Sequence, residues 1–341
     1  MKIDGGIRPS LRHAAGDAQK AEAAGYDAVW TAETSHDPFL PLVLAAEHTE
    51  NLGLGTSIAV AFARNPMTTA NTAWDLSGYS RGRFMLGLGS QIKPHIEKRF
   101  SMPWSHPAPR MKEFISAMRA IWDSWQNGTK LDFRGNFYTH TLMTPFFNPG
   151  PSEYGPPKVF LAAVGHGMTR VAGEVADGML VHGFTTERYL RERTLPAVLE
   201  GLEASGRSRR DFQFSYPAFV VSGETEQEME AAATGTRKQI AFYGSTPAYR
   251  PVLELHGWGD LQPELNTLSK RGEWDEMGRL IDDDILNAFA VVGAPHEVPK
   301  MLNARFGDLV DRLNFYTPYD GAGGSTIPKM LGALRESGRP E

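Results

Sequence analysis

The chain has 341 residues, a hydrophobic content of 41% and no cysteine. Its length and apolar content predict one large barrel or two ordinary domains with a full core, and the lack of cysteine excludes disulfides, thiol nucleophiles and cysteine-ligated metals. A formal net charge of -5 argues against nucleic acid or a membrane surface as the main partner.

The first residues of the chain contain no long apolar run, so we expect no signal peptide. No stretch of the sequence approaches the roughly 20 apolar residues that a membrane helix needs. The lack of cysteine suits a reducing compartment. These features together predict a cytoplasmic protein with no membrane partner.

Short apolar strands alternate with helices along most of the chain. The predicted strands cover residues 2–7, 27–32, 54–61, 83–89, 158–163, 178–182, 212–222 and 312–317. The predicted helices cover residues 11–24, 40–51, 66–80, 111–125, 168–174, 188–203, 224–243 and 327–336. Such alternation makes parallel sheets, and eight units close most naturally into a (β/α)8 TIM barrel with insertions. A doubly wound open sheet is the alternative, but no Gly-x-Gly-x-x-Gly opens a helix after the first strand.

The unit from residue 52 to residue 91 shows this pattern most clearly. Its strands, residues 54–61 and 83–89, are apolar on both faces, as parallel strands covered by helices are. Pro66 begins the intervening helix and Gly82 ends it. Small residues at the strand ends would let a flat ring or a phosphate approach the backbone closely.

Two segments interrupt the repeat. Residues 131–138 alternate around a Gly-Asn turn and predict a hairpin between barrel units. Residues 245–286 predict extra helices, and residues 289–292, followed by Gly-Ala-Pro, are expected to begin a further helix. We therefore expect a single domain over residues 1–341, with insertions near 90–150 and 245–286.

In a barrel of this kind the active site lies at the carboxyl ends of the strands. Most candidate site residues are therefore expected in segments that follow a strand. These segments are residues 4–5, 33–37, 57–64, 87–91, 163–168, 182–184, 216–219 and 316.

Four motifs occur in the order that is typical of one known superfamily. They are Gly-Tyr-Asp-Ala-Val-Trp-Thr-Ala-Glu at 25–33, Arg-Asn-Pro at 64–66, Ser-Arg-Gly-Arg-Phe-Met-Leu-Gly-Leu-Gly at 80–89 and Ala-Gly-Glu-Val-Ala-Asp-Gly at 172–178. In this order they resemble the bacterial luciferase-like superfamily of flavin and deazaflavin enzymes. Within it, Glu-Thr-Ser-His-Asp-Pro-Phe at 33–39 looks most like the actinobacterial oxidoreductases that use coenzyme F-420, an 8-hydroxy-5-deazaflavin.

The resemblance implies a luciferase-like barrel that transfers a hydride between coenzyme F-420 and a small organic substrate. One alternative is an FMN-dependent luciferase-like monooxygenase, because a flavin bound at the same site could react with oxygen. Another is a non-catalytic flavin- or deazaflavin-binding protein of the same fold. The apolar helix faces at 39–46 and 67–76 make a homodimer the expected assembly.

The resemblance also implies the cofactor-binding residues. A non-prolyl cis peptide bond is expected between Ser57 and Ile58, behind the ring, with an ordinary buried strand as the alternative. The cofactor's phosphate is expected at the turn after the fifth strand, where N–H groups and a helix dipole favour an anion; a plain strand-to-helix turn would need glycine equally. The predicted cofactor-binding residues are Thr34, Ser57, Ile58, Ala59, Gly87, Gly89, Gln91, Ala163, Val164, Gly165, His166, Gly167 and Met168.

His36 and Glu33 are the catalytic candidates. An imidazole can give or take a proton at neutral pH, although His36 would otherwise cap the turn at Pro38 or bind water. Glu33 would orient the ring or the substrate, or else form a salt bridge to an arginine such as Arg64. Substrate contacts are predicted for His182, Phe184 and His95.

The sequence departs from the superfamily's pattern at two places. Thr34 stands where many members carry a histidine, and Ser90 and Gln91 follow the fourth strand where some members carry an acid. The proton-transfer groups of those relatives therefore have no counterpart here. The histidines are scattered, so no metal site is predicted.

Overall fold

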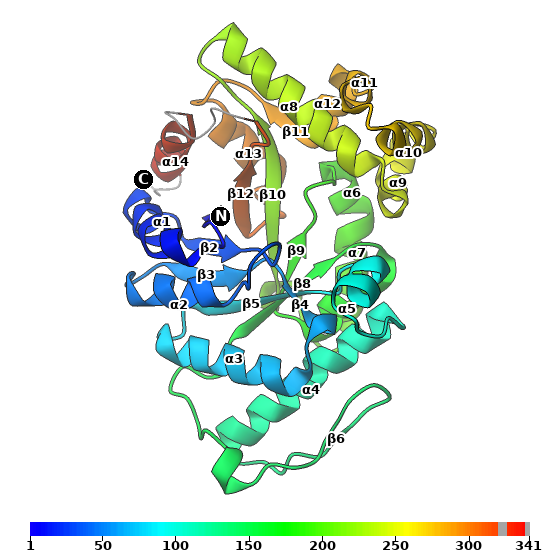
Figure 1. The fold of residues 1–341 in the computed structure, drawn as a ribbon. Coiled ribbons are helices and arrows are strands. Elements are labelled where there is room, and N and C mark those ends of the chain that lie inside the picture. Colours follow the sequence, from blue (N-terminus) through cyan, green and yellow to red (C-terminus); the bar gives the residue numbers. More distant parts are fainter. Residues whose placement is uncertain (320–325, 338–341) are drawn as a thin grey trace. The chain divides into compact units, whose positions relative to one another are not determined.

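The computed structural model describes residues 1–319 and 326–337, which form two compact units (Figure 1). The larger unit consists of Asp4–Leu180 and Ala197–Gln213. The smaller unit consists of Met1–Ile3, Val181–Pro196 and the chain from Phe214 onward. Each of the eight strands predicted from the sequence is present in the described part of the chain, and a helix follows each of them.

The larger unit contains a parallel sheet. Its strands follow the order β1, β2, β3, β5, β8 and β9, and β4 pairs with β5. Every residue of β2, β5 and β9 is buried, as expected for parallel strands covered on both faces. The bounds are β1 Lys2–Gly6, β2 Ala28–Thr31, β3 Gly53–Thr56, β4 Ala59–Val60, β5 Phe84–Gly89, β8 Lys158–Ala163 and β9 Gly178–Val181.

The third predicted strand is divided into β3 and β4. Where β3 ends, the Thr56 hydroxyl donates to the Gly87 carbonyl at 2.7 Å and accepts the Gly87 N–H at 2.9 Å. The Thr56 side chain thus satisfies both backbone groups of Gly87 in place of ladder bonds. A Cβ at position 87 would lie 1.7 Å from the Thr56 carbonyl oxygen, so this close approach requires glycine.

Helices of the larger unit begin and end at the signals expected from the sequence. Asn65 caps α3, because its side chain accepts the Thr68 N–H at 3.0 Å and Pro66 occupies the first turn. Gly25 ends α1 with a φ of 76°. The bounds are α1 Leu11–Ala24, α2 Leu40–Glu47, α3 Pro66–Tyr79, α4 Pro107–Asn127, α5 His166–Val175 and α7 Leu195–Ala204, with short helices at Ala61–Ala63, His95–Arg99, Pro145–Phe147 and Arg209–Asp211.

The predicted hairpin is present, but its second strand begins later than expected. Strand β6 (Phe133–Arg134) pairs antiparallel with β7 (Thr139–His140). The Glu113 carboxylate accepts the N–H groups of residues 136, 137 and 138 at 2.5 to 2.8 Å. These residues are therefore held by a side chain of α4, and strand pairing resumes only after them.

The smaller unit is built around β10 (Gln213–Val221). This strand pairs in parallel with β12 (Arg312–Tyr316) and with β11 (Ala290–Val292). Its apolar core joins β10 to helix α8 and to the helices that follow α8. Residues 245–286 contain several of these helices, as predicted. The helices are α6 Glu187–Tyr189, α8 Glu226–Gly244, α9 Arg250–Leu255, α10 Leu261–Arg271, α11 Trp274–Arg279, α12 Asp283–Phe289, α13 Val298–Phe306 and α14 Thr326–Ser337, with single turns at Leu190–Thr194 and Pro247–Tyr249.

One expectation about an element is wrong. Residues 289–292 do not begin a helix, because Ala290–Val292 forms β11 with Ala290 opposite Phe219. Two consecutive valines suit a buried strand better than a helix, and α13 begins only at Val298, after Pro295. Over residues 1–319 and 326–337, no helix is both long and apolar enough to cross a membrane.

Candidate active site

The structure brings four predicted cofactor-binding residues together in the larger unit: Ser57, Ile58 and Ala59, which follow β3, and Gly89, which ends β5. The peptide bond between Ser57 and Ile58 is cis, as the resemblance predicted. Ala59 is buried and lies opposite Leu88 in the β4–β5 pairing. A Cβ at Gly89 would lie 2.9 Å from the Ile58 side chain, so glycine lets the two strands approach each other here.

The next predicted residues follow β5 and are less enclosed. Gln91 lies two residues after the strand and has a left-handed backbone with a φ of 57°. His95 begins a short helix and is exposed. In the part of the chain that the structure describes, the His95 ring makes no hydrogen bond, ion pair or aromatic contact.

Glu33 is held in an ion pair. Its Oε2 accepts the Val60 N–H at 2.7 Å and pairs with Arg64 Nη1 at 2.6 Å, and Arg64 also reaches Asp37 at 3.3 Å. This is the salt bridge that the sequence offered as the alternative role for Glu33. The geometry lets Glu33 fix the strand end rather than contact a ligand directly. The neighbouring Thr34 is exposed, and its backbone carbonyl accepts a hydrogen bond from the Arg99 side chain.

His36 is exposed and lines a cavity of about 290 Å³ beside the start of α1. The cavity is also lined by residues 9–12, Asp37 and residues 40–41. Asp37 caps the turn instead of His36, because its Oδ1 accepts the Phe39 N–H at 2.8 Å. The His36 ring has no hydrogen bond within the described chain, so its two nitrogens are open to a ligand or to water.

The turn before α5 offers backbone donors. Ala163 ends β8 and is buried, while Val164 and the Gly165 to Gly167 stretch are exposed. Gly165 precedes the helix with a φ of 75°, and no side chain caps it. The first N–H groups of α5 and its dipole therefore favour an anion. The His166 ring turns away to Glu200, at 3.0 Å, so only its backbone is available here.

In the smaller unit, His182 lies within a group of aromatic side chains that we call the tyrosine cluster: His182, Tyr243, Tyr249 and Tyr316. The His182 ring stacks on Tyr249 with centroids 4.5 Å apart and meets Tyr243 edge-on at 4.8 Å. Tyr249 Oη is 3.0 Å from His182 Nε2, and Tyr243 Oη is 2.8 Å from Tyr316 Oη. The predicted substrate residue Phe184 packs against Tyr243 and Tyr249 and is buried.

Burial controls protonation in this cluster. It lowers the pKa of His182 to about 4 and, with Tyr243 as a lesser cause, raises the pKa of Tyr249 to about 12. Burial followed by the hydrogen bond to Tyr243 also raises the pKa of Tyr316. The His182 imidazole and the phenols of Tyr249 and Tyr316 are therefore uncharged at neutral pH.

Sequence reasoning missed Tyr243 and Tyr249. Tyr316 ends β12, and the sequence already indicates this position because it lies at the carboxyl end of a strand. Tyr249 lies in the inserted region and Tyr243 at the end of α8, and neither carries a spacing that relates it to His182. The only signals in the sequence are the aromatic character of the two residues and the Gly-Ser-Thr-Pro turn between them.

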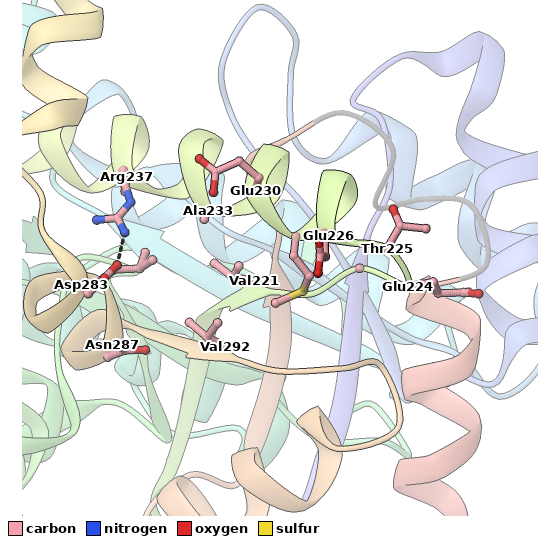
Figure 2. Close-up of a pocket in the computed structure, with 13 residues that line it drawn as sticks. Val221, Glu224, Thr225, Glu226, Glu230, Ala233, Arg237, Asp283, Asn287 and Val292 are labelled. Atoms are coloured by element: carbon pink, nitrogen blue, oxygen red, sulfur yellow. Dashed lines mark hydrogen bonds and ion pairs between the residues drawn. The ribbon is translucent and has the colours of Figure 1, made fainter.

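A separate cavity of about 460 Å³ lies in the smaller unit, and Figure 2 shows the residues that line it. Glutamates at the start of α8 line one side, and Arg237 pairs with Asp283 on another. None of the site residues predicted from the sequence lines this cavity. In the part of the chain that the structure describes, no three His, Asp or Glu side chains are grouped as a metal site requires.

The family sequence profile described as luciferase-like monooxygenase matches residues 2–312. The chain belongs to this family. An uncharacterized protein of Mycobacterium tuberculosis is 60% identical over 313 residues, which are 92% of each chain. A 5,10-methylenetetrahydromethanopterin reductase of Archaeoglobus fulgidus is 24% identical over 292 residues, 83% of this chain and 82% of that protein.

The fold is shown by similarity to a solved structure. The coenzyme F-420-dependent tetrahydromethanopterin reductase of Methanopyrus kandleri superposes with a TM-score of 0.78, at 20% identity, over 97% of both chains. The predicted fold class, a luciferase-like (β/α)8 barrel, is confirmed.

Proposed function

We propose that this luciferase-like protein binds coenzyme F-420 and transfers a hydride between the deazaflavin and a small organic substrate. The observation that carries the proposal is that the larger unit contains both a strand end with glycines and the uncapped start of α5. The first suits a flat ring and the second suits a phosphate. The relatives named for reductases, one of them dependent on coenzyme F-420, support the choice of cofactor.

The residues present fit such a cofactor. Ser57, Ile58 and Ala59 would lie against the ring, and Gly89 lets the Ile58 side chain pack closely against β5. The backbone of Gly165, His166 and Gly167 would bind the phosphate. When bound, the deazaflavin supplies a carbon that carries hydride and reacts poorly with oxygen.

The chain's own residues have distinct expected roles. Glu33, fixed by Val60 and Arg64, would hold the end of β2 in place beside the ring. His36, which is exposed and free of hydrogen bonds in the described chain, would move the substrate's proton. Binding of FMN and monooxygenation remain the alternative that the family name favours.

Titration of the purified protein with coenzyme F-420 and with FMN, each followed by fluorescence, tests the choice of cofactor. We expect saturable binding of coenzyme F-420 and reduction or oxidation of a substrate among alcohols, enones and imines. Tight binding of FMN without a response to the deazaflavin would contradict the proposal. Binding without turnover of any of these compounds would favour the non-catalytic alternative.

A matched pair of variants tests the phosphate position. Gly167 is exposed and a Cβ there meets only Ala108, at 3.8 Å, so Gly167→Asp and Gly167→Asn both fit. The carboxylate of Gly167→Asp would repel a phosphate at the start of α5 while stabilising the helix. We expect affinity for coenzyme F-420 to fall about tenfold, or about 1.4 kcal/mol. Gly167→Asn should bind almost as well as wild type, and equal effects of the two variants would place the phosphate elsewhere.

A further inference from the structure

The hydrogen bonds of the tyrosine cluster can be assigned by donor and acceptor. The Phe184 backbone N–H donates to His182 Nδ1 at 3.0 Å, so Nδ1 carries no hydrogen. The neutral ring then has its hydrogen on Nε2, which donates to Tyr249 Oη at 3.0 Å. Tyr249 Oη is thus an acceptor in this bond, and its own hydrogen has no acceptor among residues 1–319 and 326–337.

The second pair of hydroxyls leaves another hydrogen unused. Tyr243 Oη and Tyr316 Oη are 2.8 Å apart, and one donates to the other. The hydrogen of the accepting hydroxyl finds no partner in the described chain. The cluster therefore presents two phenol hydrogens that only water or a ligand can accept.

The surroundings of these hydroxyls are aromatic and uncharged. Tyr316 stacks on Phe219 with centroids 4.7 Å apart, and Phe184 lies 5.7 Å from Tyr249. The cluster's hydrogen bonds and ring contacts in the described chain are with aromatic groups or backbone. Ligand sites are commonly apolar and aromatic with a few directed polar groups, and the three tyrosines are only half-buried.

We infer that the tyrosine cluster binds a neutral carbonyl compound with a planar apolar body, and that Tyr249 donates its hydroxyl hydrogen to the carbonyl oxygen. A carbonyl oxygen has two lone pairs and no hydrogen, which matches a cluster that has hydrogens to donate. A carboxylate would need a cation, and among residues 1–319 and 326–337 no cation pairs with these side chains.

His182 is a positioning residue in this arrangement. By donating to Tyr249 Oη it occupies a lone pair of the phenol oxygen and directs the phenol hydrogen elsewhere. The backbone bond at Nδ1 prevents the opposite tautomer. Nitrogen-15 NMR of the ligand-free protein should therefore show protonated Nε2 and bare Nδ1 for this histidine between pH 7 and pH 5.

Binding of acetophenone to the protein without cofactor, measured by calorimetry or ligand-observed NMR, tests the inference. We expect acetophenone to bind more tightly than ethylbenzene, which lacks the oxygen, and than benzoate, which is charged. Tyr249→Phe should weaken acetophenone binding about three- to tenfold, the value of one neutral hydrogen bond. Tyr319→Phe is the matched control, because that hydroxyl already bonds the Ser222 backbone.

Several outcomes would overturn the inference. They are no binding of acetophenone by wild type, tighter binding of benzoate, or equal affinity of wild type and a folded Tyr249→Phe protein. If Tyr249→Phe fails to fold, the NMR tautomer and the ranking of the three probes decide. Because no cofactor is present, a failure to bind coenzyme F-420 would contradict the proposed function and leave this result intact.

Discussion

At the residue scale, His182 is a partly buried imidazole whose surroundings favour the uncharged form. Its Nδ1 accepts a backbone N–H, and burial lowers its pKa from 6.5 to about 4. Between these two values the unfolded chain binds a proton that the folded chain does not. Stability contributed by the neutral ring is therefore present above pH 6.5 and is lost as the pH falls toward 4.

This linkage predicts an acid-sensitive component of stability. At pH 5 the loss attributable to His182 is about 2 kcal/mol of unfolding free energy. Urea unfolding of wild type and His182→Asn at pH 7 and pH 5 measures it. The variant should lose less stability than wild type on acidification, by about that amount. Burial also lowers the pKa of His140, and it is the largest cause of the lowered pKa of His256. Both histidines are present in wild type and in the variant, so their effects cancel in the comparison. Equal losses would show that His182 titrates normally.

Single residues differ in how far the sequence could place them. His182 directly follows a strand, so the barrel rule alone pointed to it. The partner of Glu33 was also foreseen as Arg64, since both lie near strand ends that the topology brings together. Tyr249 could not be foreseen, because its contact with His182 depends on how an inserted segment folds.

At the element scale, the junction between β3 and β5 depends on one glycine. The Thr56 hydroxyl bonds both backbone groups of Gly87, and its carbonyl would lie 1.7 Å from a Cβ at that position. Because the obstacle is backbone rather than a flexible side chain, neither strand can yield easily. The sequence alone showed a glycine at this strand end but not what approaches it.

Two glycine-to-alanine substitutions should therefore have opposite effects. Gly87→Ala should lower the unfolding free energy by about 3 kcal/mol or more through overpacking. Gly16→Ala lies inside α1 with nothing within 4 Å of a Cβ, so it should raise stability by about 0.5 to 1 kcal/mol. Denaturant unfolding of both variants checks this, and a neutral Gly87→Ala would mean that the two strands separate more readily than their contacts indicate.

Strong periodic elements were predictable, and elements that depend on distant side chains were not. The apolar strands and their helices appear at the expected positions because each carries its own pattern and its own stop signals. The hairpin is displaced because Glu113, on α4, binds three N–H groups of its turn. Strand β11 was missed because its formation requires the edge of β10.

At the scale of the whole molecule, the order of four weak motifs identified the family, and the fold followed from it. Each motif predicts one local feature, such as the end of a strand or of a helix. The order of the motifs along the chain predicts the topology. The division into two compact units had no signal in the sequence. No composition change or flexible linker marks it, because the smaller unit is assembled from segments far apart in the chain.

Helix α2 bears on assembly. Its residues are apolar up to Glu47, and a helix that is apolar all round is usually buried all round. One face is covered within the larger unit, where Leu42 and Ala45 are fully buried. The opposite face leaves Leu40 54% exposed and Val43 41% exposed. We propose that a second copy of the chain covers this face in a homodimer.

Light scattering of the purified protein should therefore give twice the chain mass. The double variant Leu40→Glu, Val43→Glu places charges on the exposed face of α2 and should yield a folded monomer, since neither side chain supports the core of its own unit. Leu142→Glu changes an equally apolar side chain that is 73% exposed outside α2, and it should remain dimeric. A monomeric wild type would remove α2 as an interface. If the double variant is still a dimer, the contact lies on another face. Burying two unpaired carboxylates per subunit at the α2 face would cost more free energy than an interface of ordinary size gains on binding.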